Sequence, residues 1–231
     1  MSENNLEPPK KSTGDHSLTA VRAAIAAIPM AGGAAIELFN ALITPPLEKR
    51  KSEWMESVAT ELQRLTQENR ITLENIVNND LFIDAMLEAS QVALKTSSAD
   101  KKLALKNAVV NTVLPNPPDE SLQKIYIRLI DELTEWHIKL LALFDAPEAW
   151  FHQQGLKPPE FVITSSLSAL LHKAFPELQG RRDFYDYIAK DLYNKGLFAS
   201  ESLHGNMSTT GAFQSRSTEL GKGFLSFIKE Q

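Results

Sequence analysis

The side chains that could perform acid–base, nucleophilic or metal chemistry are scattered along this sequence. None of the histidines belongs to a metal-binding spacing such as His-Glu-x-x-His, and cysteine is absent, which excludes thiol catalysis and disulfides. Lys222 lies between Gly221 and Gly223, but Arg216 stands where a phosphate-binding loop needs its first glycine. We therefore expect a non-enzymatic protein with no cofactor, no metal and no evident small-molecule ligand. The histidines are His16, His137, His152, His172 and His204.

Basic residues near the C-terminus are the more specific candidates for a functional site, because they could contact the phosphates of nucleic acid. From Arg181 to Gln231 there are seven basic and six acidic residues, an excess of one. Asp183, Asp186 and Asp191 lie on or beside the helix that would enter a DNA groove, where phosphates would repel them. A role in packing or protein interaction is therefore favoured over DNA binding. The candidate nucleic-acid contacts are Arg181, Arg182, Lys190, Asn194, Lys195 and Arg216.

The stretch that positions these cations has the order of a winged helix. Phe184, Ile188 and Leu192 recur at four-residue spacing, so they share one buried face of a helix. Gly196 ends that helix, since glycine readily takes the left-handed backbone of a helix C-terminus. A polar strand-turn-strand and a last apolar helix capped by Thr218 complete the predicted unit.

The N-terminal residues divide into a polar arm and an apolar stretch. Residues 1–17 bury nothing obvious and carry no pattern of a secretory signal, so we expect a disordered arm and a cytoplasmic protein. Residues 18–43 are rich in alanine, and the uncharged run between Arg22 and Glu37 reaches roughly 21 Å as a helix, against about 30 Å for a hydrocarbon core. It cannot span a bilayer unaided.

Two interpretations of this apolar stretch stay open. The favoured one is a pair of short helices, broken at 29–33 and ended by Pro45-Pro46, packed within a bundle. The alternative is that residues 23–36 insert into or lie on a membrane. In either case the candidate contacts to a partner or to lipid are Ile25, Ile28, Met30 and Ile36.

The middle of the chain predicts further helices. Trp54, Val58, Leu62 and Leu65 share one face of an amphipathic helix. Two more helices should begin at the capping residues 78–80 and Ser98, and the prolines of 115–118 should form a stiff connector. The most regular helix should run from Leu122 to Leu143 without a break, because its apolar residues alternate at four and three residues and form a seam for partner helices.

The whole chain is predicted to be mainly α, with a helical bundle followed by a winged-helix-like α+β unit. The expected divisions are the arm 1–17, the bundle 18–146, an ordered connector 147–164 and the winged-helix-like domain 165–231. The 231 residues include 43% hydrophobic ones, enough for such a core. A formal net charge of −5 provides no general attraction to nucleic acid or anionic lipid.

The C-terminal pattern resembles the abortive-infection alpha family, helical bacterial proteins associated with phage defence. The residues that carry the resemblance are Leu192, Gly196-Leu197, and Thr218, Gly221 and Phe224, with Arg50 following an apolar opening upstream. The resemblance implies a bacterial defence protein that acts through protein contacts, and it implies no catalytic residues. The rival functions are a DNA-binding regulator that uses the winged helix and a membrane-acting toxin that uses residues 23–36.

Overall fold

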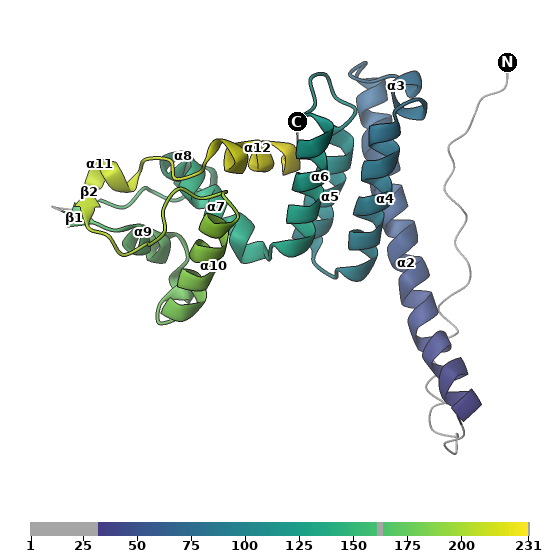
Figure 1. Ribbon diagram of the computed structural model, residues 1–231, viewed down its shortest axis with the longest axis horizontal. Coiled ribbons are helices and arrows are strands. Elements are labelled where there is room, and N and C mark those ends of the chain that lie inside the picture. Colours follow the sequence, from purple (N-terminus) through teal and green to yellow (C-terminus); the bar gives the residue numbers. More distant parts are fainter. Residues whose placement is uncertain (1–31, 161–163, 231) are drawn as a thin grey trace. The chain divides into compact units, whose positions relative to one another are not determined.

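The computed structural model of the chain describes residues 32–160 and 164–230 (Figure 1). Over these residues the chain forms eleven α-helices, one 3₁₀ helix and one pair of two-residue strands, so the fold is mainly α as predicted. The chain divides into two compact units, Met1–Pro117 and Pro118–Gln231. The division falls in the proline-rich connector and not after residue 146, because the helices between 118 and 146 pack with those that follow them.

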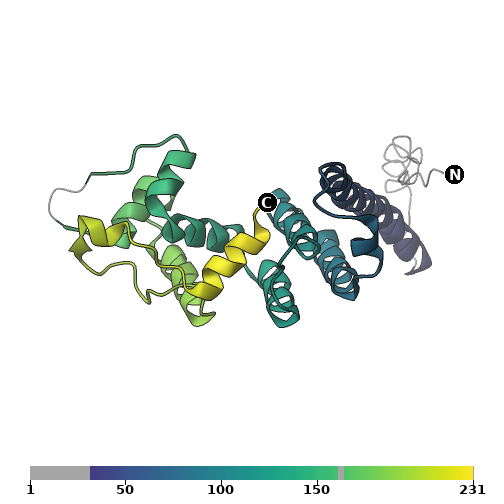
Figure 2. The ribbon, with the colours of Figure 1, turned by 90° about the horizontal axis from the view of Figure 1, so that it is seen from above.

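The N-terminal unit is a bundle of three long helices. α2, α4 and α5 contact one another pairwise, and they lie side by side in both ribbon views (Figures 1 and 2). The short α3 connects α2 to α4. The elements are α2 (Gly32–Gln67), α3 (Leu73–Val77), α4 (Asp80–Lys95) and α5 (Ala99–Asn111).

Local signals place these helices where the sequence predicted them. Trp54, Val58 and Leu65 are buried on one face of α2, as their spacing indicated. The Asn79 side chain accepts the Phe82 N–H at the start of α4. Ser98 accepts the Lys101 N–H at the start of α5 in the same way. Each cap satisfies a backbone donor that has no partner within its helix.

The prediction that Pro45-Pro46 ends a helix is wrong, because α2 continues through both prolines to Gln67. The two prolines remove the donors that would reach the carbonyls of Ala41 and Leu42. Residues 40–49 are exposed throughout, so water can hydrate these carbonyls. This part of α2 extends past the neighbouring helices of its unit (Figure 1), and we call residues 40–49 the α2 arm.

A half-buried carboxylate joins α2 to α5 and gives the N-terminal unit a pH dependence. Glu61 Oε1 accepts a 3.0 Å hydrogen bond from Arg64 Nε, and Oε2 lies 3.4 Å from Lys106 Nζ. The hydrogen bond from Arg64, together with the charges of Arg64 and Lys106, holds the pKa of Glu61 below its usual value. A lowered pKa in the folded state stabilises the fold above the unfolded-state pKa, and this stabilisation is lost as the pH falls through the folded-state pKa.

We expect Glu61→Gln to lower the free energy of unfolding at pH 7 by about 1 kcal/mol. At a pH below the lowered pKa of Glu61 the wild type is protonated too, so the two proteins should be equally stable there. Urea denaturation across pH 3 to 7 measures this difference. The exposed Glu56→Gln serves as the matched control, and a Glu61→Gln effect that is constant over the whole range would contradict the assignment.

The C-terminal unit contains the remaining elements. α7 packs against α8, α9, α10 and α12 and is the central helix of the unit. The two strands pair antiparallel, with Thr164 opposite Ser208 and Ser165 opposite Met207. The elements are α6 (Glu120–Glu132), α7 (Glu135–Asp145), α8 (Pro147–Gln153), β1 (Thr164–Ser165), α9 (Leu167–Ala174), η1 (Pro176–Leu178), α10 (Arg182–Asn194), β2 (Met207–Ser208), α11 (Thr209–Ala212) and α12 (Glu219–Ile228).

The prediction of one continuous helix from Leu122 to Leu143 is wrong, because the chain bends between α6 and α7. Leu133 and Thr134 have extended backbones, and Thr134 takes the N-cap position of α7. The ring Nδ1 of His137 accepts the Thr134 N–H at 3.1 Å. A residue that caps a helix needs a non-helical backbone, so this local interaction overrides the heptad spacing.

The helices expected at the C-terminus are present. Ser166 caps α9, accepting the Ala169 N–H, and Thr218 caps α12, accepting the Gly221 N–H. Gly196, with φ of 73°, follows the end of α10. The base of the predicted hairpin also forms, since Ala199 N–H donates to Arg216 O and Thr218 N–H donates to Leu197 O.

The strand-turn-strand expected above this base is not observed. Met207 and Ser208 pair with β1 instead of with the other arm of the hairpin, and Thr209–Ala212 forms the short helix α11. Ser208 accepts the Gly211 N–H and so begins a helical turn where the sequence suggested a polar strand. The side-chain cap has again prevailed over the strand pattern.

Candidate functional site

The cations on α10 are paired with carboxylates of the same protein. Arg182 Nε lies 3.3 Å from Asp186 Oδ2. Lys190 pairs with Glu201 in the loop after α10, and Lys195 Nζ lies 2.8 Å from an oxygen of Glu132. The hydrogen bond from Lys195 lowers the pKa of Glu132 below its usual value.

The loop between α10 and β2 covers part of the polar face of α10. Besides the pair between Lys190 and Glu201, His204 Nε2 lies 2.7 and 3.0 Å from the two carboxylate oxygens of Asp186. The His204 ring also packs near Tyr185, with ring centroids 5.9 Å apart. A helix that inserts into a DNA groove needs its polar face free of contacts with the rest of the chain. The loop interactions therefore disfavour DNA binding by α10.

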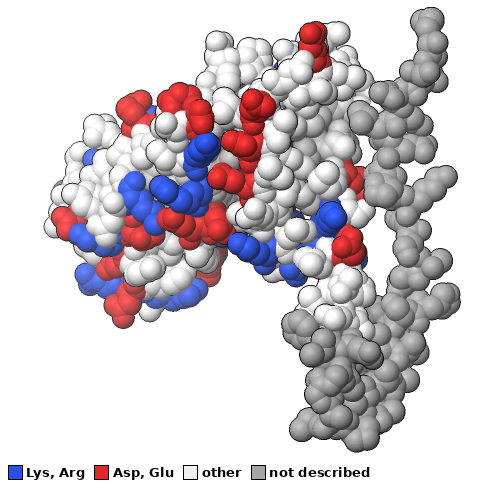
Figure 3. Space-filling view, turned by 45° about the vertical axis from the view of Figure 1, so that its right-hand side comes forward, with Lys and Arg blue, Asp and Glu red and all other residues white. Residues whose placement is uncertain are grey.

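The other predicted nucleic-acid contacts have different surroundings. Arg181 stacks over the ring of Phe184 at 4.3 Å, and Asn194 is exposed at the end of α10. Arg216 donates to Gly211 O at 2.8 Å and thereby holds the segment before it. Basic and acidic side chains are intermingled on the part of the C-terminal unit that Figure 3 shows, which is unlike the uniform cationic surface that phosphates require.

His137 is the buried histidine of the described residues, at 3% exposed. Its Nδ1 lies 2.8 Å from the Thr134 hydroxyl, and its Nε2 lies 3.2 Å from Asp191 Oδ2. The order threonine, histidine, aspartate resembles a nucleophile with its base and orienting acid. However, Nδ1 already accepts the Thr134 backbone N–H, so its lone pair is occupied by the helix cap. The arrangement is explained by the start of α7, and the sequence did not identify this cap.

Metal ligands are not brought together either. Within residues 32–160 and 164–230, no three histidine, aspartate or glutamate side chains are grouped as a metal ion requires. No helix of those residues is both long enough and apolar enough to cross a membrane. The proposed membrane or partner contacts Ile25, Ile28 and Met30, and the side chain of Ile36, lie outside the described residues.

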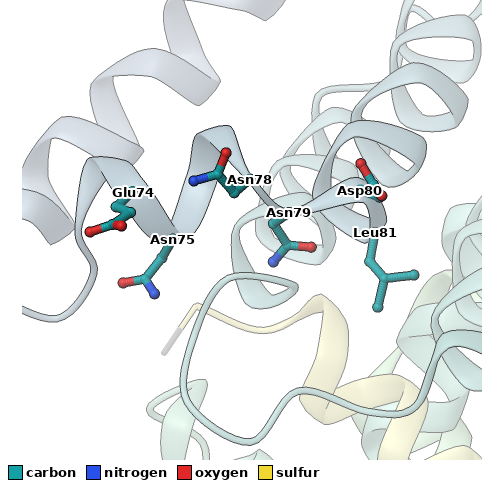
Figure 4. A pocket seen from close by; sticks show the side chains of 6 residues that line it. All are labelled: Glu74, Asn75, Asn78, Asn79, Asp80 and Leu81. Atoms are coloured by element: carbon teal, nitrogen blue, oxygen red, sulfur yellow. The ribbon is translucent and has the colours of Figure 1, made fainter.

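A surface pocket of about 510 Å³ lies at the junction of α3 and α4 (Figure 4). Two of its asparagine side chains bond to the backbone at the helix starts. Asn75 Oδ1 accepts the Thr72 N–H, and Asn79 Oδ1 accepts the Phe82 N–H. The polar lining therefore follows from two helix starts, and it does not need a ligand to explain it. The lining residues are Glu74, Asn75, Asn78, Asn79, Asp80 and Leu81.

From this pocket, the outward face of α4 continues as two parallel rows of side chains. Ile83 and Leu87 lie four residues apart and form an apolar row; they are 43% and 60% exposed. Asp80, Asp84 and Glu88 follow at the same spacing beside them and form an acidic row, all exposed. Side chains four residues apart share one side of a helix. We call these five residues the α4 surface, and it is the best candidate site in the described chain.

The α4 surface is opposite the buried side of the same helix. Phe82, Ala85 and Ala89 face the bundle, together with Val92 and Ala93. The apolar row is therefore additional to the buried core of the unit. Adjacent apolar side chains that are left exposed beside charged residues can serve as an interaction site.

Comparison of the chain with protein-family models, with curated proteins and with solved structures gives no match.

Proposed function

We propose that this chain is a non-enzymatic bacterial protein that acts in the cytoplasm through protein–protein contacts, with phage defence by abortive infection as its setting. The observation that carries the proposal is the amount of apolar helix surface left uncovered in the N-terminal unit. The α4 surface is one such area. The phage-defence setting rests on the resemblance of the C-terminal pattern.

The α2 arm supports the same proposal. Ile43, Leu47, Trp54, Val58 and Leu65 follow one another at intervals of four and seven residues, so they form one stripe along α2. The last three residues are buried in the bundle, whereas Ile43 and Leu47 are 47% and 41% exposed. The stripe that forms the core thus continues beyond the core. A helix in water gains most of its stability from tertiary packing. We therefore expect the exposed stripe of the α2 arm to pack against a partner.

The C-terminal unit, we further propose, is winged-helix-like over residues 165–231. The order α9, α10, hairpin base and α12 supports this assignment, although the tip of the hairpin is replaced by β2 and α11. Because the cations of α10 are paired within the chain, the unit is proposed to serve packing or protein contacts. The rival of a DNA-binding regulator predicts a salt-dependent shift of duplex DNA that Arg181→Ala with Arg182→Ala abolishes.

A photo-reactive phenylalanine analogue placed at Leu87 tests the proposal in bacteria that express the whole chain. We expect irradiation to produce discrete covalent adducts with protein at this position. The same analogue at the exposed Gln63, on α2 but outside the α2 arm, is the matched control and should produce none of these adducts. If Leu87 becomes linked only to nucleic acid or lipid, or to nothing, the proposal that the chain acts through these contacts is wrong.

A further inference from the structure

Resting on the proposed function, we infer that the α4 surface binds a basic amphipathic helix of a protein partner. The α4 surface is Asp80, Ile83, Asp84, Leu87 and Glu88. The inference concerns the chemical class of the partner, which the proposed function leaves open.

The spacing of the two rows determines the shape of the partner. Both rows run along α4 with one residue about every turn, roughly 6 Å apart. A second helix laid along α4 presents its own side chains at the same interval, so its apolar residues can pack against Ile83 and Leu87 over successive turns. The apolar side chains are exposed over two consecutive turns, which suits a short helical segment.

The negative charge of the α4 surface indicates that the partner is positively charged. Three carboxylates lie at positions one, five and nine of α4, and the only base of that helix is Lys95 at its far end. A partner with lysine or arginine beside its apolar row places cations opposite this acidic row, which speeds association and fixes the register. The same carboxylates repel phosphate groups, so the surface disfavours nucleic acid and anionic lipid.

The probe for this inference is a synthetic peptide of about four helical turns, built from leucine and lysine with an apolar stripe at helical spacing. Its counterpart carries glutamate at every lysine position. Binding of each to the whole chain is measured by fluorescence anisotropy at low and high salt. We expect the lysine peptide to bind, more weakly as salt increases, and the glutamate peptide to show at least tenfold lower affinity.

Two variants of the chain separate the two rows. Asp84→Asn with Glu88→Gln keeps the shape and removes two charges, and we expect a loss of affinity of roughly tenfold at low salt. Leu87→Asp removes the apolar contact and should abolish binding. The matched control is Glu53→Gln with Glu56→Gln, two exposed carboxylates of α2, which should leave the affinity unchanged. Circular dichroism confirms that each variant keeps its helix content.

Several results would overturn the inference. These are equal binding of both peptides, wild-type affinity in the charge variant, no binding of the lysine peptide, or a Leu87-dependent attachment to anionic vesicles. The photo-cross-linking distinguishes this failure from failure of the proposed function. Protein adducts at Leu87 that persist in the Asp84→Asn, Glu88→Gln background would leave protein contacts in place and reject a basic partner.

Discussion

Replacing Gly221 by alanine is expected to lower the free energy of unfolding of the C-terminal unit by about 3 kcal/mol. A Cβ on Gly221 would overlap the carbonyl oxygen of Leu197 and lie 3.2 Å from its carbonyl carbon. That backbone cannot easily withdraw, because Leu197 O accepts the Thr218 N–H and Leu197 N–H donates to Leu192 O. The gain of about 1 kcal/mol that alanine brings to a helix interior is too small to compensate.

Gly223, two residues further along α12, provides the matched comparison. Its Cβ would overlap the hydroxyl oxygen of Tyr126 and lie 3.3 Å from the ring carbon that bears it. Removing that hydroxyl with Tyr126→Phe should recover part of the stability lost in Gly223→Ala. No side-chain change can relieve Gly221→Ala in the same way, since its clash is with backbone. Gly205→Ala, with no atom within 4 Å of the new Cβ, should be nearly neutral.

Urea denaturation of these four variants, followed by circular dichroism, measures the differences. A Gly221→Ala protein that unfolds at the wild-type urea concentration would show that α12 does not approach Leu197 as closely as described. A Gly223→Ala protein that Tyr126→Phe fails to rescue would contradict the contact with Tyr126.

Phe144→Ala should destabilise the C-terminal unit by about 3–5 kcal/mol, because it removes a wholly buried ring from the central helix α7. The ring of Phe144 lies 5.5 Å from that of Phe198, and the Phe144 carbonyl accepts the Arg216 N–H at 2.7 Å. Phe198 and Ser217 form the bridge at the base of the hairpin. The cavity left by the substitution therefore lies under the contact that holds this base.

Hydrogen exchange followed by mass spectrometry localises the effect of Phe144→Ala. We expect protection to fall in α7, in α10 and around Phe198, and to stay unchanged in α4 and α5, which belong to the other unit. Tyr187→Ala, at a side chain that is largely exposed, is the control and should change stability by less than about 0.5 kcal/mol. Equal loss of protection in both units would contradict the division of the chain.

Features that depend on neighbouring residues were predictable from the sequence. Asn79, Ser98 and Thr218 each cap a helix through a side chain and a backbone group three residues away. Ser98 and Thr218 were predicted individually, and Asn79 lies within the predicted capping residues 78–80. The bend at Thr134 was missed although its signal is equally local. There His137 takes the place that glutamate usually occupies in a capping box, and the regular apolar spacing on both sides concealed the break.

The candidate site was only partly predictable. The sequence of α4 has apolar residues on both sides of the helix, of which Phe82 and Ala85 are buried whereas Ile83 and Leu87 are exposed. The pairing of charges was beyond sequence reasoning, because Lys195 and Glu132 are 63 residues apart. Counting cations along the chain gives their excess over the acids, but it does not show which carboxylate each cation faces.

The chain bends between α6 and α7, although the apolar spacing of its sequence would suit one straight helix equally well. Apolar residues keep the heptad interval on both sides of Thr134, so a single helix through this point would still present one continuous hydrophobic seam. A side-chain cap at Thr134 and His137 marks the point where the helix breaks. Loss of this cap would cost about 1 kcal/mol, whereas the packing of α7 against α8, α9, α10 and α12 would still favour the bend.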